Sequence, residues 1–150
     1  MMADHAEGIT TCPHCGTRNR VPAAATGLPR CGKCKELLPW QADATDADFA
    51  EVVEQSALPV LADLWAPWCG PCRVVAPGVA KAAEVFAGKL KVVKVNVDIA
   101  QNVAVRYQAQ SIPLLLLLDK GAVRARQVGA VPPDALLRWV DQSLALPPAA

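Results

Sequence analysis

Three Cys-x-x-Cys pairs constrain this chain more than any other feature of its sequence. They read CPHC at 12–15, CGKC at 31–34 and CGPC at 69–72, and together they contain all six cysteines. The same spacing serves redox pairs and metal sites, so the surrounding residues must decide which chemistry each pair supports. The first two pairs lie in a segment with little apolar periodicity, whereas the third follows an apolar run.

The first two pairs together have a spacing typical of tetrahedral zinc, Cys-x2-Cys-x15-Cys-x2-Cys. Each pair predicts a tight turn that brings two sulfurs to one ion, and the interleaved Arg and Lys residues would offset the charge of four thiolates. Two surface disulfides are an alternative, but a two-residue gap makes a strained bridge. Iron in place of zinc is a second alternative, although a closed pair of such turns favours zinc. We expect one structural zinc ion, with four ligands: Cys12, Cys15, Cys31 and Cys34.

The third pair has no second pair nearby to complete a metal site. It lies where the apolar strand-like residues 59–66 meet a predicted helix that begins near Gly70. Unpaired N–H groups at a helix N-terminus favour a thiolate at Cys69, and Cys72 lies one turn further on, where it can close a disulfide. Pro71 suits a first helical turn, and Gly70 leaves the approach to the sulfur uncrowded. The alternative is a pair of buried, inert cysteines.

Strands and helices alternate from residue 59 onward, which is typical of an α/β sheet covered by helices. We expect a zinc-binding segment at 1–40 and a second domain at 41–150, with a linker near 37–44 and a helix after the capping-type sequence TDAD at 45–48. The strands predicted after it are 59–66, 90–97, 114–118 and a last strand that ends at 128, with a turn at 119–122 before that last strand. The predicted helices are 70–87, 100–107 and a final helix with one apolar face, formed by Leu136, Leu137, Val140 and Leu144.

The composition excludes several classes of protein. The chain is 53% hydrophobic, which suits a globule, and its formal net charge of +1 selects neither nucleic acid nor an acidic membrane. The longest apolar run, at 112–118, is far shorter than the roughly 20 residues that span a bilayer. Since the N-terminus has no secretory pattern, we expect a cytoplasmic monomer that binds neither nucleic acid nor membrane.

The sequence LADLWAPWCGPCRVVAP at 61–77 resembles the active-site strand and helix of thioredoxins. The resemblance continues in order through VVKVNVD at 92–98, SIP at 111–113 and VGAVP at 128–132, and covers about residues 45–146. The sequences CPHCGTRNRVP and CGKC are similar to the N-terminus of the zinc-containing thioredoxin 2 subtype of bacteria. The resemblance implies an α/β thioredoxin fold, a central mixed sheet flanked by helices, with a small zinc-ribbon-like segment before it.

The same resemblance implies a thiol-disulfide oxidoreductase, that is, a general protein disulfide reductase without an organic cofactor. Cys69 would attack a substrate disulfide and Cys72 would resolve the mixed disulfide. The implied partners are disulfide-containing proteins and an NADPH-dependent thioredoxin reductase that recharges the pair. A zinc-dependent, redox-regulated binding or holdase module is the alternative from another class. Gly-Pro between the cysteines disfavours an oxidase or isomerase.

Further site residues are implied by matching the family's motifs. Asp63 matches a buried acid whose raised pKa would let it exchange a proton with Cys72. Lys94 matches a lysine near that acid, and the alternative for it is a solubilising charge on an edge strand. Pro113 matches a cis-proline that faces the disulfide. Leu114 replaces the usual threonine, which enlarges the apolar surface of the following strand and could alter that edge of the substrate groove. The implied substrate contacts are Trp68, Gly70, Pro71, Ile112, Pro113, Gly129 and Ala130.

Overall fold

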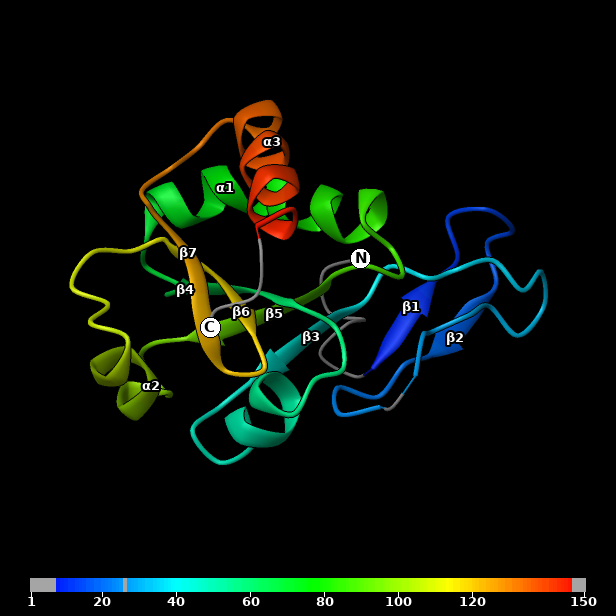
Figure 1. Cartoon of the computed structure of the whole chain (residues 1–150), viewed down its shortest axis with the longest axis horizontal. Coiled ribbons are helices and arrows are strands. Elements are labelled where there is room, and N and C mark those ends of the chain that lie inside the picture. The colour runs from blue at the N-terminus through cyan, green and yellow to red at the C-terminus, as the bar shows by residue number, and fades with distance from the viewer. Residues whose placement is uncertain (1–7, 26, 147–150) are drawn as a thin grey trace.

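A computed structural model of the chain describes residues 8–25 and 27–146, which form one large sheet, one small sheet and the helices that cover the large sheet (Figure 1). The small sheet contains β1 (Ile9–Thr11) and β2 (Arg18–Arg20). The large sheet has the order β3 (Gln41–Ala44), β5 (Lys91–Asn96), β4 (Val60–Trp65), β6 (Leu114–Asp119) and β7 (Ala122–Val128). The helices are η2 (Ala50–Glu54), α1 (Gly70–Val85), α2 (Gln101–Arg106) and α3 (Pro133–Leu144).

The large sheet is mixed, as the sequence predicts. The strands β3, β5 and β4 run parallel, whereas β6 runs antiparallel to both β4 and β7. The predicted turn between β6 and β7 contains Lys120 and Gly121, both with positive φ, which is the backbone of a tight hairpin. The strands β4 and β6 are buried except at their last residues, because helices cover both faces of the sheet.

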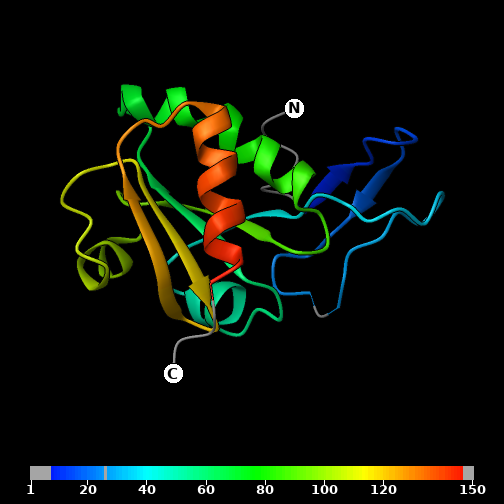
Figure 2. The same cartoon turned by 45° about the horizontal axis from the view of Figure 1, so that its top comes forward.

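Two apolar clusters hold the layers together. One joins the sheet to α1 and α3, and the other joins the opposite face to η2 and α2 (Figure 1). The first includes Leu61, Val75, Val79, Leu115, Leu136 and Val140. The second includes Val53, Ala62, Leu64, Val95, Val103 and Leu116. The small sheet lies to one side of this sandwich in both views (Figure 2).

The linker predicted near 37–44 is wrong. Residues 41–44 form strand β3, which pairs in parallel with β5, and Leu38 and Trp40 are each only 1% exposed. Alternation is present here, since Trp40, Ala42 and Ala44 are buried while Gln41 and Asp43 are half-buried. Alanine and aspartate rarely occur in strands, so the segment lacks the composition by which a strand is usually recognised.

The helix predicted after TDAD is only the short π-helical turn η2. The capping contacts do form: the Thr45 N–H donates to Asp48 Oδ1 at 2.7 Å, and the Ala47 N–H donates to Thr45 Oγ1 at 3.3 Å. The turn ends where the Gln55 N–H bonds the Ala50 carbonyl, and strand β4 follows closely. In the described part of the chain, no helix is long and apolar enough to cross a membrane.

Candidate active site and metal centre

The third cysteine pair lies at the start of α1, where the sequence places it. Cys69 is the N-cap residue of that helix, and its sulfur accepts a hydrogen bond from the Cys72 N–H at 3.2 Å. A disulfide joins the two cysteines, and each is 4% exposed. Because the sulfur of Cys69 caps the helix, unpaired N–H groups and the macrodipole would stabilise its thiolate once the disulfide is reduced.

A cis peptide bond faces the disulfide. Ile112 and Pro113 are joined by this bond, and the Ile112 carbonyl oxygen lies 3.8 Å from Cys69 Sγ. The Pro113 carbonyl accepts the N–H of Gly129, whose φ is +94°. The residue before Pro113 thus meets the cysteine pair, while the residue after it begins β6.

The surface around the disulfide is formed by exposed and half-buried residues. Trp68 is 68% exposed, and its indole Nε1 donates to Asp98 Oδ1 at 3.1 Å. Asp98 therefore holds an exposed aromatic ring in place beside the disulfide. The sequence reasoning missed this role, although Asp98 ends the quoted motif VVKVNVD. The other expected contact residues are exposed or half-buried, except for the buried Pro113: Gly70, Pro71, Ile112, Gly129 and Ala130.

Asp63 is a buried carboxyl on the α1 side of the sheet. Its neighbours in β4, Ala62 and Leu64, belong to the cluster on the opposite face, and its own exposure is 0%. Neither of its carboxyl oxygens has a hydrogen-bond partner among the described residues. Burial raises the pKa of Asp63 from 3.8 to about 6, and the charge of Lys94 partly opposes that rise.

Lys94 lies directly beside Asp63 in the sheet. The two residues are register partners across β4 and β5, and Lys94 Nζ lies 4.7 Å from the centre of the Trp65 ring. The alternative reading as an edge-strand charge is wrong, because β5 lies between β3 and β4. Trp65 packs against the cluster that contains both cysteines, so lysine, tryptophan and cysteine pair share one side of the sheet.

Leu114 does not enlarge the substrate groove. Its exposure is 0%, and it packs with Leu64 and Val103 in the cluster on the η2 and α2 face. The residue after the cis-proline therefore adds to the apolar face of β6 that lies in the core, and not to the surface around the disulfide.

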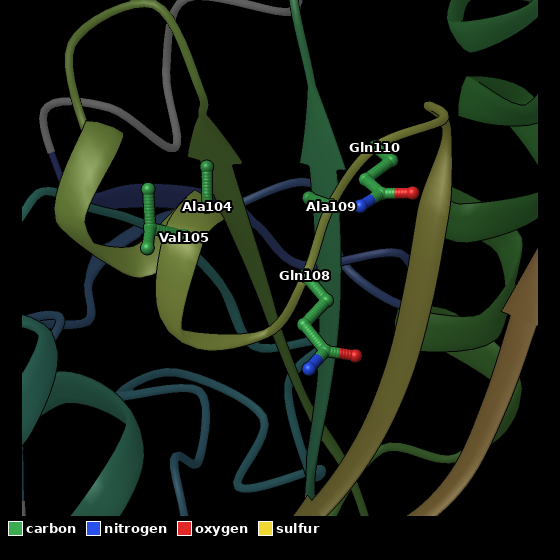
Figure 3. Close-up of a pocket in the computed structure, with 5 residues that line it drawn as sticks. All are labelled: Ala104, Val105, Gln108, Ala109 and Gln110. Carbon is green, nitrogen blue, oxygen red and sulfur yellow. The ribbon is translucent and has the colours of Figure 1, made fainter.

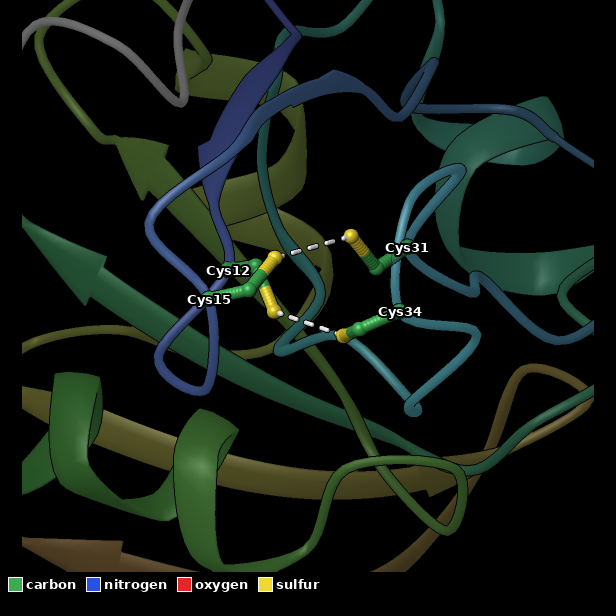
Figure 4. Close-up of side chains that lie close together, drawn as sticks. All are labelled: Cys12, Cys15, Cys31 and Cys34. Carbon is green, nitrogen blue, oxygen red and sulfur yellow. Dashed lines mark hydrogen bonds between the residues drawn. The ribbon is translucent and has the colours of Figure 1, made fainter.

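The first two cysteine pairs meet as one cluster. The four sulfurs lie within 4.8 Å of one another, and the shortest separations run between the turns, 3.6 Å for Cys12–Cys34 and for Cys15–Cys31 (Figure 4). Among the described residues, no other cysteine, histidine or acidic group belongs to it. His14, inside the first Cys-x-x-Cys turn, is exposed.

The protonation of these thiols tests whether a cation fits. Backbone N–H groups of Cys34 and Lys33 and the Asn19 amide lower the pKa of Cys31 to about 6, against the effect of burial. Burial and the neighbouring cysteines raise the pKa of Cys34 to about 12, although the Glu36 N–H lowers it. Four sulfurs this close repel one another as thiolates, and a divalent cation would stabilise all four at this spacing. The donor set therefore fits zinc.

Asn19 is a part of this centre that the sequence reasoning missed. It lies in β2, and its amide nitrogen approaches Cys31 Sγ at 3.5 Å while its amide oxygen accepts the Gly32 N–H at 2.9 Å. One side chain thus joins the small sheet to the second Cys-x-x-Cys turn. The only signal in the sequence is a lone amide between two arginines, which does not reveal a contact 12 residues away.

A separate pocket of about 300 Å³ lies at the end of α2 and in the loop after it (Figure 3). Its lining is Ala104, Val105, Gln108, Ala109 and Gln110. None of these side chains titrates or acts as a nucleophile, so the pocket offers no chemistry of its own.

Comparison with known proteins gives two family matches. Residues 41–142 match the Thioredoxin family, and residues 11–36 match the family described as Thioredoxin 2, N-terminal. The chain belongs to the thioredoxin family. The thioredoxin of Haemophilus influenzae is 48% identical over 99 residues, 66% of this chain and 92% of that protein. Thioredoxin C-3 of Corynebacterium nephridii is 37% identical over 144 residues, 91% of this chain and 95% of that protein.

The family and the cysteine pair together establish the chemistry. This thioredoxin family member is a thiol-disulfide oxidoreductase of the protein disulfide reductase type, with a redox pair at Cys69 and Cys72. It carries a four-cysteine, zinc-ribbon-type site before the thioredoxin domain. Sequence and structure therefore agree on the fold, on the oxidoreductase class and on the separation of the two cysteine systems.

The buried carboxyl predicts a pH-dependent stability. Because the folded-state pKa of Asp63 exceeds its ordinary value, the folded state binds more protons between pH 3.8 and about 6. The contribution of Asp63 to stability should fall as pH rises through that window, by about 3 kcal/mol in total, and should then stay constant. We expect Asp63→Asn to remove this loss and to be more stable than the wild type at pH 7. Urea unfolding from pH 4 to pH 8 measures both curves.

The matched control is Asp141→Asn, at an exposed position in α3, which should keep the wild-type curve. If the difference in stability between the wild type and Asp63→Asn stayed constant across that pH window, the raised pKa of Asp63 would be contradicted.

The Asn19 contacts predict a role in holding the metal. Asn19→Ala removes the donor to Cys31 and the acceptor for Gly32, and we expect zinc affinity to fall roughly tenfold or more. Titration of the reduced protein with a chromophoric zinc chelator measures the affinity. Asn102→Ala, at an exposed position in α2, is the control. Equal zinc affinity in all three proteins would show that the Asn19 contacts are incidental.

Proposed function

We propose that the chain reduces disulfides of other proteins, with Cys69 as the attacking group and Cys72 as the resolving group. The observation that supports this assignment most directly is the position of Cys69 Sγ, which caps α1 and faces the carbonyl of Ile112. The Cys72 N–H that donates to this sulfur would stabilise an attacking thiolate. Cys72 lies within the helix, and its sulfur is bonded to that of Cys69.

The reaction proceeds in two exchanges. The Cys69 thiolate attacks one sulfur of the substrate disulfide, and the other substrate sulfur leaves as a thiolate and takes up a proton. The Cys72 thiol then loses its proton and attacks Cys69 Sγ, so that the second substrate sulfur leaves as a thiolate. Two electrons pass to the substrate, and Cys69 and Cys72 end as the disulfide. A thioredoxin reductase that draws on NADPH returns those two electrons.

Asp63 is the proposed proton acceptor for Cys72. It lies on the α1 side of the sheet without a fixed hydrogen-bond partner, and its pKa of about 6 is suited to proton exchange near neutral pH. Lys94 is a positioning residue in this proposal, because its charge opposes the rise in the pKa of Asp63.

An extended substrate segment would bind beside the cis-proline. The exposed ring of Trp68 and the half-buried Ile112 offer apolar contact area, and the exposed backbone near Gly129 and Ala130 offers hydrogen bonds. Gly70 and Pro71 lie exposed beside the disulfide, and no atom lies within 4 Å of where a Cβ at Gly70 would be. The approach to Cys69 is therefore open on that side.

The zinc-ribbon segment is proposed as residues 1–40 and the thioredoxin domain as 41–150. The cluster around the zinc ligands supports this boundary, because its buried residues are Cys12, Val21, Cys31, Leu38 and Trp40, although Leu58 also packs against it. We propose that the chain is a monomer in the cytoplasm. The four clustered cysteines are free thiols, and free thiols persist in a reducing compartment.

The roles of the two redox cysteines are tested by single substitutions. Cys69→Ser should abolish insulin reduction, because the attacking sulfur is lost. Cys72→Ser should also lose turnover but should accumulate a mixed disulfide with substrate, which non-reducing mass spectrometry detects. Turnover by Cys69→Ser would disprove the assignment, and suppression of aggregation without turnover by the wild type would favour the holdase alternative.

The metal content of variants tests the zinc proposal. The purified reduced protein should hold one zinc ion per chain by elemental analysis. That ion should remain after combined Cys69→Ser and Cys72→Ser, and it should be lost on substitution of any two of the four clustered cysteines. Zinc loss in the Cys69→Ser, Cys72→Ser protein would show that the two cysteine systems are not separate.

A further inference from the structure

Lys91 is a buried cation that neither the redox reaction nor the metal site uses. It is the first residue of β5, its exposure is 1%, and no carboxylate among the described residues forms an ion pair with it. Burial of an ammonium group is costly unless its donors are satisfied. The contacts that satisfy Lys91 therefore identify what the fold gains from it.

The contacts of Lys91 come from three separate parts of the chain. Its Nζ donates to the carbonyl of Val52 in η2 at 2.6 Å and to the carbonyl of Ala23 in the zinc-ribbon segment. The ring of Trp40 lies 4.4 Å from the same Nζ. Two charge-assisted hydrogen bonds and a cation–π contact thus converge on one buried atom.

The contacts of Lys91 join the segment that holds the four cysteines to the core of the thioredoxin domain. Trp40 packs in one cluster with Cys12 and Cys31, and its carbonyl accepts the N–H of Val92 at 2.8 Å. Ala23 packs against the core cluster that contains Val52 and the sheet strands. The segment that holds the metal ligands is therefore seated on the thioredoxin domain at Lys91.

We propose that Lys91 is the docking site of the thioredoxin domain for its own zinc-ribbon segment, and that this contact couples zinc binding to the packing of η2 and β5. The proposal rests on zinc binding by the four cysteines. When zinc is bound, the segment presents the Ala23 carbonyl and the Trp40 ring to Lys91. When zinc is lost and the segment unfolds, Nζ loses one acceptor and its aromatic cover.

The coupling must be reciprocal, because it is a free energy shared by two sites. Loss of zinc should loosen η2, which contains no zinc ligand. Loss of the Lys91 contacts should in turn weaken zinc binding, although Lys91 touches no ligand. A side chain that only filled space in β5 would produce neither effect.

The first experiment uses the wild-type chain with reduced cysteines. Hydrogen–deuterium exchange is measured with zinc bound and after removal of zinc by a chelator. We expect faster exchange without zinc in residues 21–25, in η2 and at the start of β5, and unchanged exchange in α3. Zinc-independent exchange in η2 would overturn the proposal without affecting the zinc site, whereas a chain that binds no zinc would refute the metal assignment and the proposal together.

The second experiment compares variants at Lys91. Lys91→Met keeps the length of the side chain but removes the donors, and we expect about tenfold weaker zinc affinity and exchange in η2 that no longer depends on zinc. Lys91→Arg keeps charge and donors and should recover part of both effects. Lys89→Met, at an exposed position two residues earlier, is the control. Zinc affinity in Lys91→Met equal to that of the control would overturn the proposal.

Discussion

The antiparallel pairing of β4 with β6 determines where the redox centre lies. Leu64 and Leu114 are register partners at the end of this ladder. The chain leaving β4 must therefore pass the chain entering β6, which brings Cys69 beside the Ile112–Pro113 peptide. Both strands are apolar and buried, so a one-residue slip would exchange the two faces of each strand and move Asp63 to the wrong side. Core burial thus fixes the geometry of the site.

The same spacing of cysteines gives two chemistries because the pairs sit on different backbones. Cys12–Cys15 and Cys31–Cys34 each lie in a turn, where backbone N–H groups and the Asn19 amide point at sulfur. Four sulfurs then converge, which suits a cation. Cys69 and Cys72 instead start a helix of 16 residues, where the second sulfur is directed at the first. The local backbone, and not the motif, separates a metal ligand from a redox group.

The sequence predicted the elements that carry strong local signals. The alternation of strands and helices, the turn at 119–122 and the helix start near Gly70 were all predicted from local sequence. Strand β3 was not, because its buried residues are alanines and its strand character depends on pairing with β5. The apolar run at 112–118 is typical of a buried strand, and Leu114 is buried, but the run does not reveal which face of β6 this residue occupies.

Site residues that act through a distant partner were the hardest to predict. The hydrogen bond between Asp98 and Trp68 is visible only in the structure, because the two residues are 30 positions apart in the sequence. Asn19 and Lys91 are similar, because their partners come from other segments. A single sequence shows which residue is present but not which distant residue its side chain contacts. The reactive cysteines were predictable because their partner lies three positions away.

The two buried ionisable groups of the sheet show how solvation separates a reactive role from a structural one. Asp63 and Lys91 lie on adjacent strands but face opposite sides of the sheet. Asp63 has no fixed partner among the described residues, so its charge is poorly stabilised and its proton can be exchanged. Lys91 has two carbonyl acceptors and an aromatic ring, which hold its charge in one place. A group that must gain and lose a proton benefits when few protein groups stabilise its charge. A group that joins segments instead requires protein contacts that satisfy all of its donors. In our proposals, the redox side of the sheet therefore responds to protons, while Lys91 on the opposite side keeps the zinc-ribbon segment in place.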